Sequence, residues 1–214
     1  MQFSPSPSPS SFPLSGLSRR HLMLGSAALG LSSVSLCAWS QSTTEAGGIK
    51  FDNRITVQGQ SLQLNGAGVR YKAVFKVYAA GLYLSQKTDT PETALSVAGP
   101  KRIRLTMLRD IDNNEFGKLF TRGVEDNTPR NEMSRLVPGL IRMSEVFSSN
   151  KKFTHGDTIL IDWLPGEGTY ITVRDKVQGE AFKEPEFFNA LLRIWLGKSP
   201  ADHQLKEALL GKPS

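Results

Sequence analysis

Cysteine is nearly absent from this 214-residue sequence, which contains only Cys37, and there are three histidines. One cysteine excludes an intrachain disulfide, and only His155 and His203 lie beyond the first forty residues, which is too few for the usual multi-histidine metal centres. The sequence signatures of common enzymes are also missing: there is no G-x-S-x-G, no H-E-x-x-H, no P-loop and no G-x-G-x-x-G. We therefore predict no metal, no cofactor and no catalytic site of a familiar kind.

Long apolar runs are scarce as well. The best candidate, residues 22–36, is shorter than the ~20 residues that a membrane-spanning helix needs. A Ser/Pro tract and the pair Arg19 and Arg20 precede it, and a small-x-small site at 38–40 follows it. This order is typical of a cleavable export signal, and "SRRHL" resembles the twin-arginine type. An N-terminal membrane anchor and a lipoprotein site at Cys37 are the alternatives.

We therefore expect residues 1–40 to comprise a disordered tract and an export signal, and residues 41–214 to form one domain that is periplasmic or otherwise exported. Cleavage near Ser40 would remove two arginines and lower the formal charge from +6 to +4. A charge this small and dispersed does not predict nucleic-acid binding. It is consistent with weak attraction to anionic membrane surfaces. The mature chain would retain no cysteine, and of the histidines only His155 and His203, which we expect on the surface.

The hydrophobic pattern after Gly48 predicts strands, then helices, then strands and helices again. Period-two alternation predicts a hairpin at 49–68, a long strand at 69–84, a strand at 101–111 and a hairpin at 157–177. Helical spacing and capping residues predict helices at 90–99, 112–127, 130–150, 184–197 and 199–211, with Pro138 kinking or splitting the third. The fold class is α+β: an antiparallel sheet covered on one face by a layer of helices.

Several residues in these elements have simple structural explanations. The glycine-rich tetrapeptide "NGAG" at 65–68 is read as a sharp bend between strands rather than a phosphate site. Arg102 and Arg104 alternate with apolar residues and are expected on a solvated face, whereas Tyr71 and Tyr83 are expected to pack.

The stretch "LNGAGVRYKAVFKVYAAGLYL" resembles the chalcone isomerase superfamily, in which a Gly-x-Gly-x-Arg segment leads into a strand with a Gly-x-Tyr end. The segments "IRLTMLRDIDNNEFGKLF", "DTILIDWLPGEGTYITV" and "FFNALLRIWLGKSPADHQLKEALLG" extend the resemblance over roughly residues 48–211. It implies an antiparallel sheet, a helical layer and a ligand cleft between them. The superfamily includes plant isomerases and relatives that bind fatty acids.

By this resemblance, Arg70 matches the family's strand arginine. Tyr78 falls where the isomerases have threonine, Phe116 near their tyrosine and Gly123 near their asparagine, so the isomerase network is incomplete here. Arginine paired with tyrosine is instead implied for the fatty-acid-binding branch. The resemblance thus favours an exported, non-catalytic protein that binds a fatty acid or similar apolar carboxylate.

We expect Arg70 and Tyr78 to hold the ligand's head group, with Phe116 and Phe120 lining the pocket for its tail. One geometric condition applies, because a straight strand would place positions 70 and 78 ~26 Å apart. They converge only through a bulge, a bend or a tight turn; otherwise Arg70 is solvated or paired within the protein. Two alternatives stay open: an isomerase that uses Arg70 and Tyr78 on an unknown substrate, and an envelope structural protein whose cleft its own side chains fill. The oligomeric state is left open too.

Overall fold

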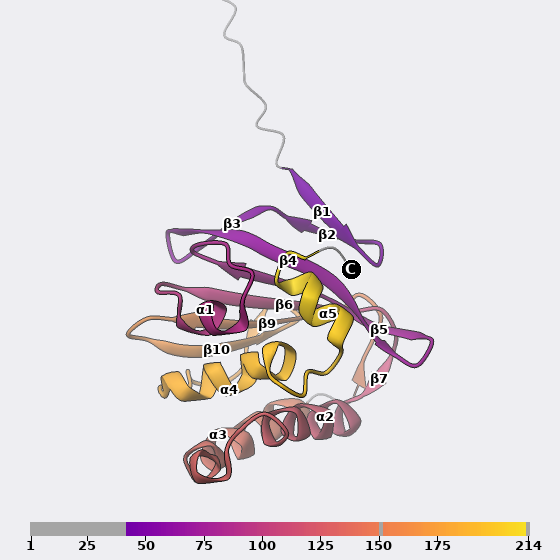
Figure 1. Cartoon of the computed structure of the whole chain (residues 1–214). Helices are drawn as coiled ribbons and strands as arrows, with labels where there is room; N and C mark the ends of the chain where they lie inside the picture. The colour runs from indigo at the N-terminus through magenta and orange to yellow at the C-terminus, as the bar shows by residue number, and fades with distance from the viewer. Residues whose placement is uncertain (1–41, 150–151, 213–214) are drawn as a thin grey trace, which may run out of the picture. The chain divides into compact units, whose positions relative to one another are not determined.

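The computed structural model describes residues 42–149 and 152–212, which belong to one compact unit (Figure 1). The expected export signal lies outside the described residues and stays a prediction. Seven strands form one sheet in the order β11-β10-β9-β6-β5-β4-β3, and all neighbours are antiparallel. Their bounds are β3 (Arg54–Val57), β4 (Gln60–Lys72), β5 (Phe75–Leu84), β6 (Lys101–Met107), β9 (Thr158–Leu164), β10 (Gly168–Val173) and β11 (Lys176–Val177).

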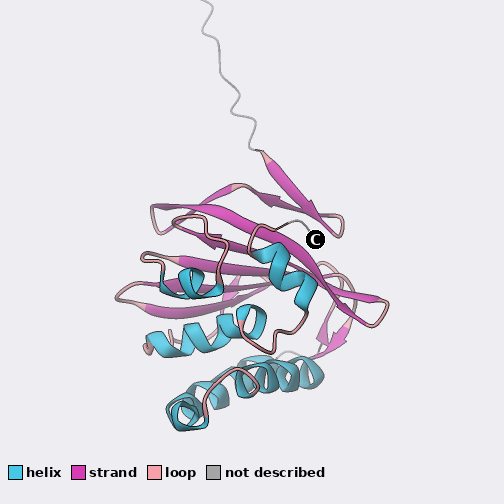
Figure 2. Cartoon of the chain, viewed as in Figure 1, coloured by secondary structure: helices cyan, strands magenta, loops and turns pink. Residues whose placement is uncertain are grey.

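Helices cover one face of this sheet, as Figure 2 shows by colour. Their bounds are α1 (Pro91–Ser96), α2 (Asn113–Glu125), α3 (Arg130–Ser148), α4 (Pro185–Leu196) and α5 (His203–Leu209). Eight of the twelve α4 side chains are buried, because α4 packs against the sheet on one side and against α2 and α3 on the other. The predicted α+β class with a helical layer is confirmed. None of the helices in the described residues is both long and apolar enough to span a membrane.

The other face of the sheet is not solvated as predicted. A hairpin of β1 (Thr43–Ala46) and β2 (Ile49–Asp52) packs over it, and Phe51 and Tyr83 are buried there. Arg102 forms an ion pair with the largely buried Asp162 at 2.6 Å, and the Arg104 guanidinium lies 5.2 Å from the Phe51 ring centroid. The prediction of a solvated arginine face is wrong, because the alternation in β6 does not reveal that a separate hairpin covers it.

The predicted long strand at 69–84 is also wrong. The chain reverses at Ala73 and Val74, so the segment contributes the end of β4 and the whole of β5, which pair in a hairpin. Ala73 occupies the left-handed region with φ +54°. No glycine, asparagine or proline marks the turn, which is why the pattern did not reveal it.

The tetrapeptide 65–68 is not a bend, because all four residues continue β4. Its glycines face α5: a Cβ atom on Gly66 would lie 2.0 Å from the Ala208 carbonyl oxygen, and one on Gly68 would lie 2.7 Å from the Ala208 Cβ. The side-chain amide of Asn65 donates to the carbonyl oxygens of Thr88 and Leu209. The segment therefore seats the last helix against the sheet.

One helical boundary differs from expectation, and one of the two alternatives for Pro138 is excluded. The last helix begins at His203, and Asp202, not Ser199, is its N-cap, since its side chain accepts a hydrogen bond from the Leu205 amide at 3.0 Å. Helix α3 continues through Pro138 without being split. A small pair of strands, β7 (Ile111–Asp112) and β8 (Lys152–Phe153), flanks the α2–α3 segment.

Substituting Gly66 tests the close approach of α5. The Gly66→Ala variant should lose about 1–3 kcal/mol of unfolding free energy, because the added methyl group meets backbone that cannot move independently. Gly117→Ala on α2 is the matched control: its methyl group would lie 3.6 Å from Phe147, an ordinary contact, and alanine favours the helix by up to about 1 kcal/mol. Chemical denaturation measures both, and equal stability of Gly66→Ala and the parent would contradict the packing.

Candidate functional site

The β4–β5 hairpin brings Arg70 and Tyr78 together. They are direct cross-strand partners, and so they share the face that the helices cover. The register shifts by one residue between Arg70 and Tyr71, so that Val77 is the extra residue on β5. Without this bulge Arg70 would face Val77. The turn and the bulge together satisfy the geometric condition for convergence.

Tyr78 is the more deeply buried residue of this pair, with 2% of its surface exposed. Its hydroxyl oxygen accepts a hydrogen bond of 2.9 Å from the Trp195 indole nitrogen of α4. Burial raises the pKa of the phenol, and the nearby Arg70 charge and the Trp195 hydrogen bond oppose that effect without cancelling it. The phenol is therefore protonated at neutral pH, and its O–H can donate to an anion.

Arg70 lies on β4 just beyond the two glycines that seat α5. Its guanidinium carbon is 5.5 Å from the Tyr78 ring centroid. Its Nε atom is buried and has no hydrogen-bond partner among the described residues, and no carboxylate of that part of the chain forms an ion pair with it. The same guanidinium contacts the Tyr78 hydroxyl through a side-chain hydrogen bond, but a buried N–H without an acceptor is costly, so this position suits an anion that arrives from outside the chain.

A pocket of about 310 Å³ opens beside Arg70, between the β4–β5 hairpin and the start of α2. Its lining combines two further cations with apolar side chains and two acids: Lys72, Ala73, Phe75, Val77, Arg109, Asp110, Ile111, Glu115 and Leu119. Both acids are neutralised, since Glu115 pairs with Lys72 at 3.0 Å and Asp110 with Lys152 at 2.6 Å. The volume is at the lower end of the range for small-molecule sites.

The predicted tail residues Phe116 and Phe120 lie on the buried face of α2, deeper than the pocket lining. Phe116 meets the Tyr78 ring at a centroid distance of 6.4 Å, and Phe120 meets Trp195 at 5.6 Å. Phe147 packs edge-on against both. Phe116 and Phe120 therefore belong to an aromatic cluster that packs against Tyr78 and Trp195.

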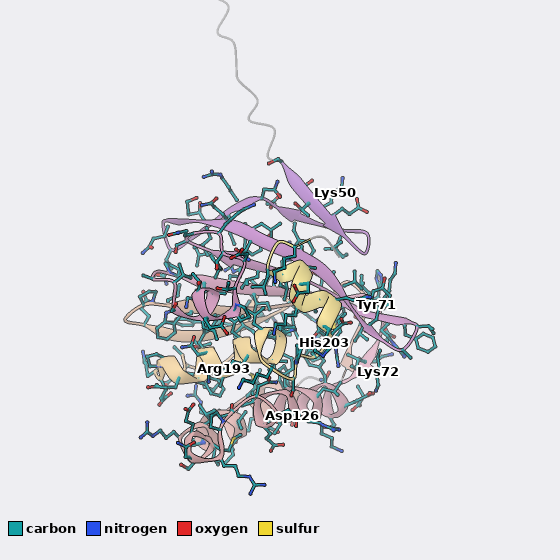
Figure 3. All side chains as sticks on the ribbon, viewed as in Figure 1. Lys50, Tyr71, Lys72, Asp126, Arg193 and His203 are labelled. Atoms are coloured by element: carbon teal, nitrogen blue, oxygen red, sulfur yellow. The ribbon has the colours of Figure 1, made fainter. Side chains whose placement is uncertain are left out.

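Asp202 connects this site to the last helix. While one carboxylate oxygen caps α5, the other accepts a hydrogen bond of 2.9 Å from the Tyr71 backbone amide, next to Arg70. Figure 3 marks Tyr71 and Lys72 on β4 and His203 at the start of α5. Among the described residues, no three side chains of His, Cys, Asp or Glu gather where they could hold a metal ion.

The sequence matches the model of the family described as chalcone isomerase-like over residues 43–211. The chain belongs to the chalcone isomerase-like family. Among solved structures, it is similar to a fatty-acid binding protein of Arabidopsis thaliana, with a TM-score of 0.61 and 16% identity over 79% of this chain and 96% of that chain. No curated protein matches it.

Two residues of this chalcone isomerase-like protein were not found from the sequence. Trp195, the partner of Tyr78, sits in an apolar helical segment whose pattern predicts only core packing. Arg109 lies near the end of the segment 101–111 that was predicted to be a strand, and only the structure brings it to the Arg70 pocket. Gly123, which the resemblance aligns near an isomerase asparagine, packs against Ile194 instead of facing the pocket.

Replacing Tyr78 with phenylalanine tests the hydrogen bond to Trp195. At neutral pH the variant should lose about 1–3 kcal/mol, because the buried indole N–H loses its acceptor. The raised folded-state pKa of Tyr78 gives stability that is fully present below pH 10 and is lost as pH rises through that pKa. Unfolding free energy should therefore fall less steeply above pH 10 in Tyr78→Phe than in the parent.

The matched control is Tyr71→Phe, at an exposed tyrosine of the same hairpin, whose stability at neutral pH should change by no more than about 0.5 kcal/mol. Urea denaturation between pH 7 and 11 measures all three proteins. Equal alkaline slopes for the parent and Tyr78→Phe would contradict the assigned pKa direction.

Proposed function

We propose that this protein binds a fatty acid or a similar apolar carboxylate without catalysing a reaction. The carboxylate meets the Arg70 guanidinium, and the Tyr78 hydroxyl donates to the same anion from the opposite strand. Planar guanidinium and carboxylate groups match in a two-point hydrogen-bonded geometry, which makes this pairing stronger than one between neutral groups.

The observation that carries the proposal is the unpartnered, buried Nε of Arg70 at the wall of a pocket. Arg102, on the opposite face of the sheet, has an internal carboxylate partner in Asp162. The described residues give Arg70 an aromatic neighbour and an opening instead. The chain belongs to the chalcone isomerase-like family, and its fold is similar to that of a fatty-acid binding protein; both facts support a fatty acid as the ligand class.

The apolar side of the pocket provides the start of a path for the tail. Val77, Ile111 and Leu119 line it, and the Phe116 and Phe120 rings lie behind them. Since that aromatic cluster is closely packed, a long acyl chain would enter by displacing these rings or by lying along the hairpin. The same packing favours a second candidate: an envelope protein whose cleft is filled by its own side chains.

We also propose that the protein is exported to the periplasm, which rests on Arg19, Arg20 and the small-x-small site at 38–40. Replacing both arginines with lysine should leave the protein unprocessed and inside the cell, if the signal is of the twin-arginine type. Cell fractionation and N-terminal sequencing test this, with a mature start near Gln41 expected in the parent. A parent recovered at full length from the cytoplasm would contradict export.

Arg70→Ala tests the binding site. Its affinity for oleate should fall at least about tenfold, because one charge-assisted contact is lost, whereas its affinity for oleyl alcohol, which has no charge, should change little. Arg104→Ala is the matched control, since that arginine also stacks on an aromatic ring but on the opposite face of the sheet. Isothermal titration calorimetry measures binding, and native mass spectrometry shows any co-purified lipid.

The outcomes separate the candidate functions. Equal loss in Arg70→Ala and Arg104→Ala would remove Arg70 as the head-group residue. A parent that neither retains lipid nor takes up oleate would favour the filled-cleft envelope protein. Turnover of an added chalcone, lost in both Arg70→Ala and Tyr78→Phe, would instead support the isomerase alternative, in which the protonated Tyr78 serves as an acid.

A further inference from the structure

The tip of the β4–β5 hairpin, defined as residues 71–76, exposes an unusual amount of apolar surface. Val74 is 82% exposed, Phe75 60% and Tyr71 39%. Turns at the surface normally consist of small polar residues, yet this one places an aliphatic and an aromatic side chain next to each other in water. In Figure 1 the hairpin end extends past the neighbouring strands β6 and β9.

Positive charges surround this apolar tip. Lys72 and Lys76 belong to it, and the guanidinium of Arg109 lies 5.3 Å from the Phe75 ring centroid. Lys72 is paired with Glu115, but neither Lys76 nor Arg109 forms an ion pair with a residue that the structure describes. The combination of exposed aromatic and aliphatic groups with unpaired cations matches the boundary of an anionic lipid bilayer, where apolar groups enter the acyl region and cations remain at the phosphates.

We propose that the hairpin tip docks onto an anionic lipid bilayer, with Val74 and Phe75 inserted and Lys76 and Arg109 at the lipid head groups. Lys72, Ala73 and Phe75 of the tip also line the Arg70 pocket, so docking places the pocket mouth at the membrane surface. With the pocket mouth at the membrane surface, an amphiphilic carboxylate can pass between the bilayer and the pocket; this part of the inference rests on the proposed function. Docking itself does not depend on ligand binding.

A local reporter tests the docking. In a Cys37→Ser background of the full chain, Val74→Cys carries an environment-sensitive fluorophore, and Val177→Cys is the matched control because Val177 is also an exposed apolar residue, 58% accessible, but on the edge strand β11. Vesicles of equimolar phosphatidylglycerol and phosphatidylcholine, with nitroxide-labelled lipid as quencher, are added to each. Because the reading is local to each label, attachment of the chain through another segment does not count.

The label at 74 should shift to the blue and be quenched on the anionic vesicles, more weakly at high salt, while the label at 177 should not respond. Adding Lys76→Glu to the Val74→Cys protein should raise the half-saturating lipid concentration about tenfold, since each cation near an anionic surface adds to binding. No response at 74, an equal response at 177, or an equal response on pure phosphatidylcholine would overturn the proposal.

Arg70→Ala in the Val74→Cys protein separates this proposal from the function above. The label should respond to vesicles as in the parent even where oleate binding is lost. A parent that docks but takes up no oleate removes the ligand proposal and leaves docking in place. A response at 74 that disappears in Arg70→Ala overturns docking by the tip alone.

Discussion

The absence of a side chain at two positions of β4 determines where the polar groups of this cleft lie. Gly66 and Gly68 let the backbone of α5 rest directly on the strand, at distances that a Cβ atom would not permit. Because α5 is held there, its capping residue Asp202 reaches the Tyr71 amide and stops short of Arg70. The arginine comes two residues after the second glycine, on the same face of the strand, and is only partly buried.

A second contact connects the sheet with the buried helix α4. The hydrogen bond from Trp195 holds the buried phenol of Tyr78 beside Arg70 and leaves the hydroxyl's own proton free to be donated. Fixing both rings limits the side-chain entropy that would be lost when an anion binds. The opposite face of the sheet, with its Arg102–Asp162 pair, shows how the same fold treats an arginine that needs no external partner.

Sequence patterns predicted the fold well where periodicity and capping were clear. The α+β class, the helix beginning at Pro91 and the hairpin around Gly166 all follow from local rules. The β4–β5 turn was missed because Ala73 adopts a left-handed conformation that residue type does not signal. The convergence of Arg70 and Tyr78 depends on that turn and on a one-residue bulge. From the sequence it could be inferred only that some bend, bulge or turn between the two residues was required. Trp195 was missed because a contact across 117 residues has no local signature.

The Asp202 carboxylate has a consequence for how the protein is made. It joins residues 131 positions apart, and the Tyr78–Trp195 contact is almost as distant in sequence. Contacts of such high sequence separation form late, since the loops between them must close before any energy is gained. The polar end of the cleft can therefore be completed only after Trp195 and Asp202 have left the ribosome, so a nascent chain that stops before Trp195 would contain the sheet strands but neither of these two contacts.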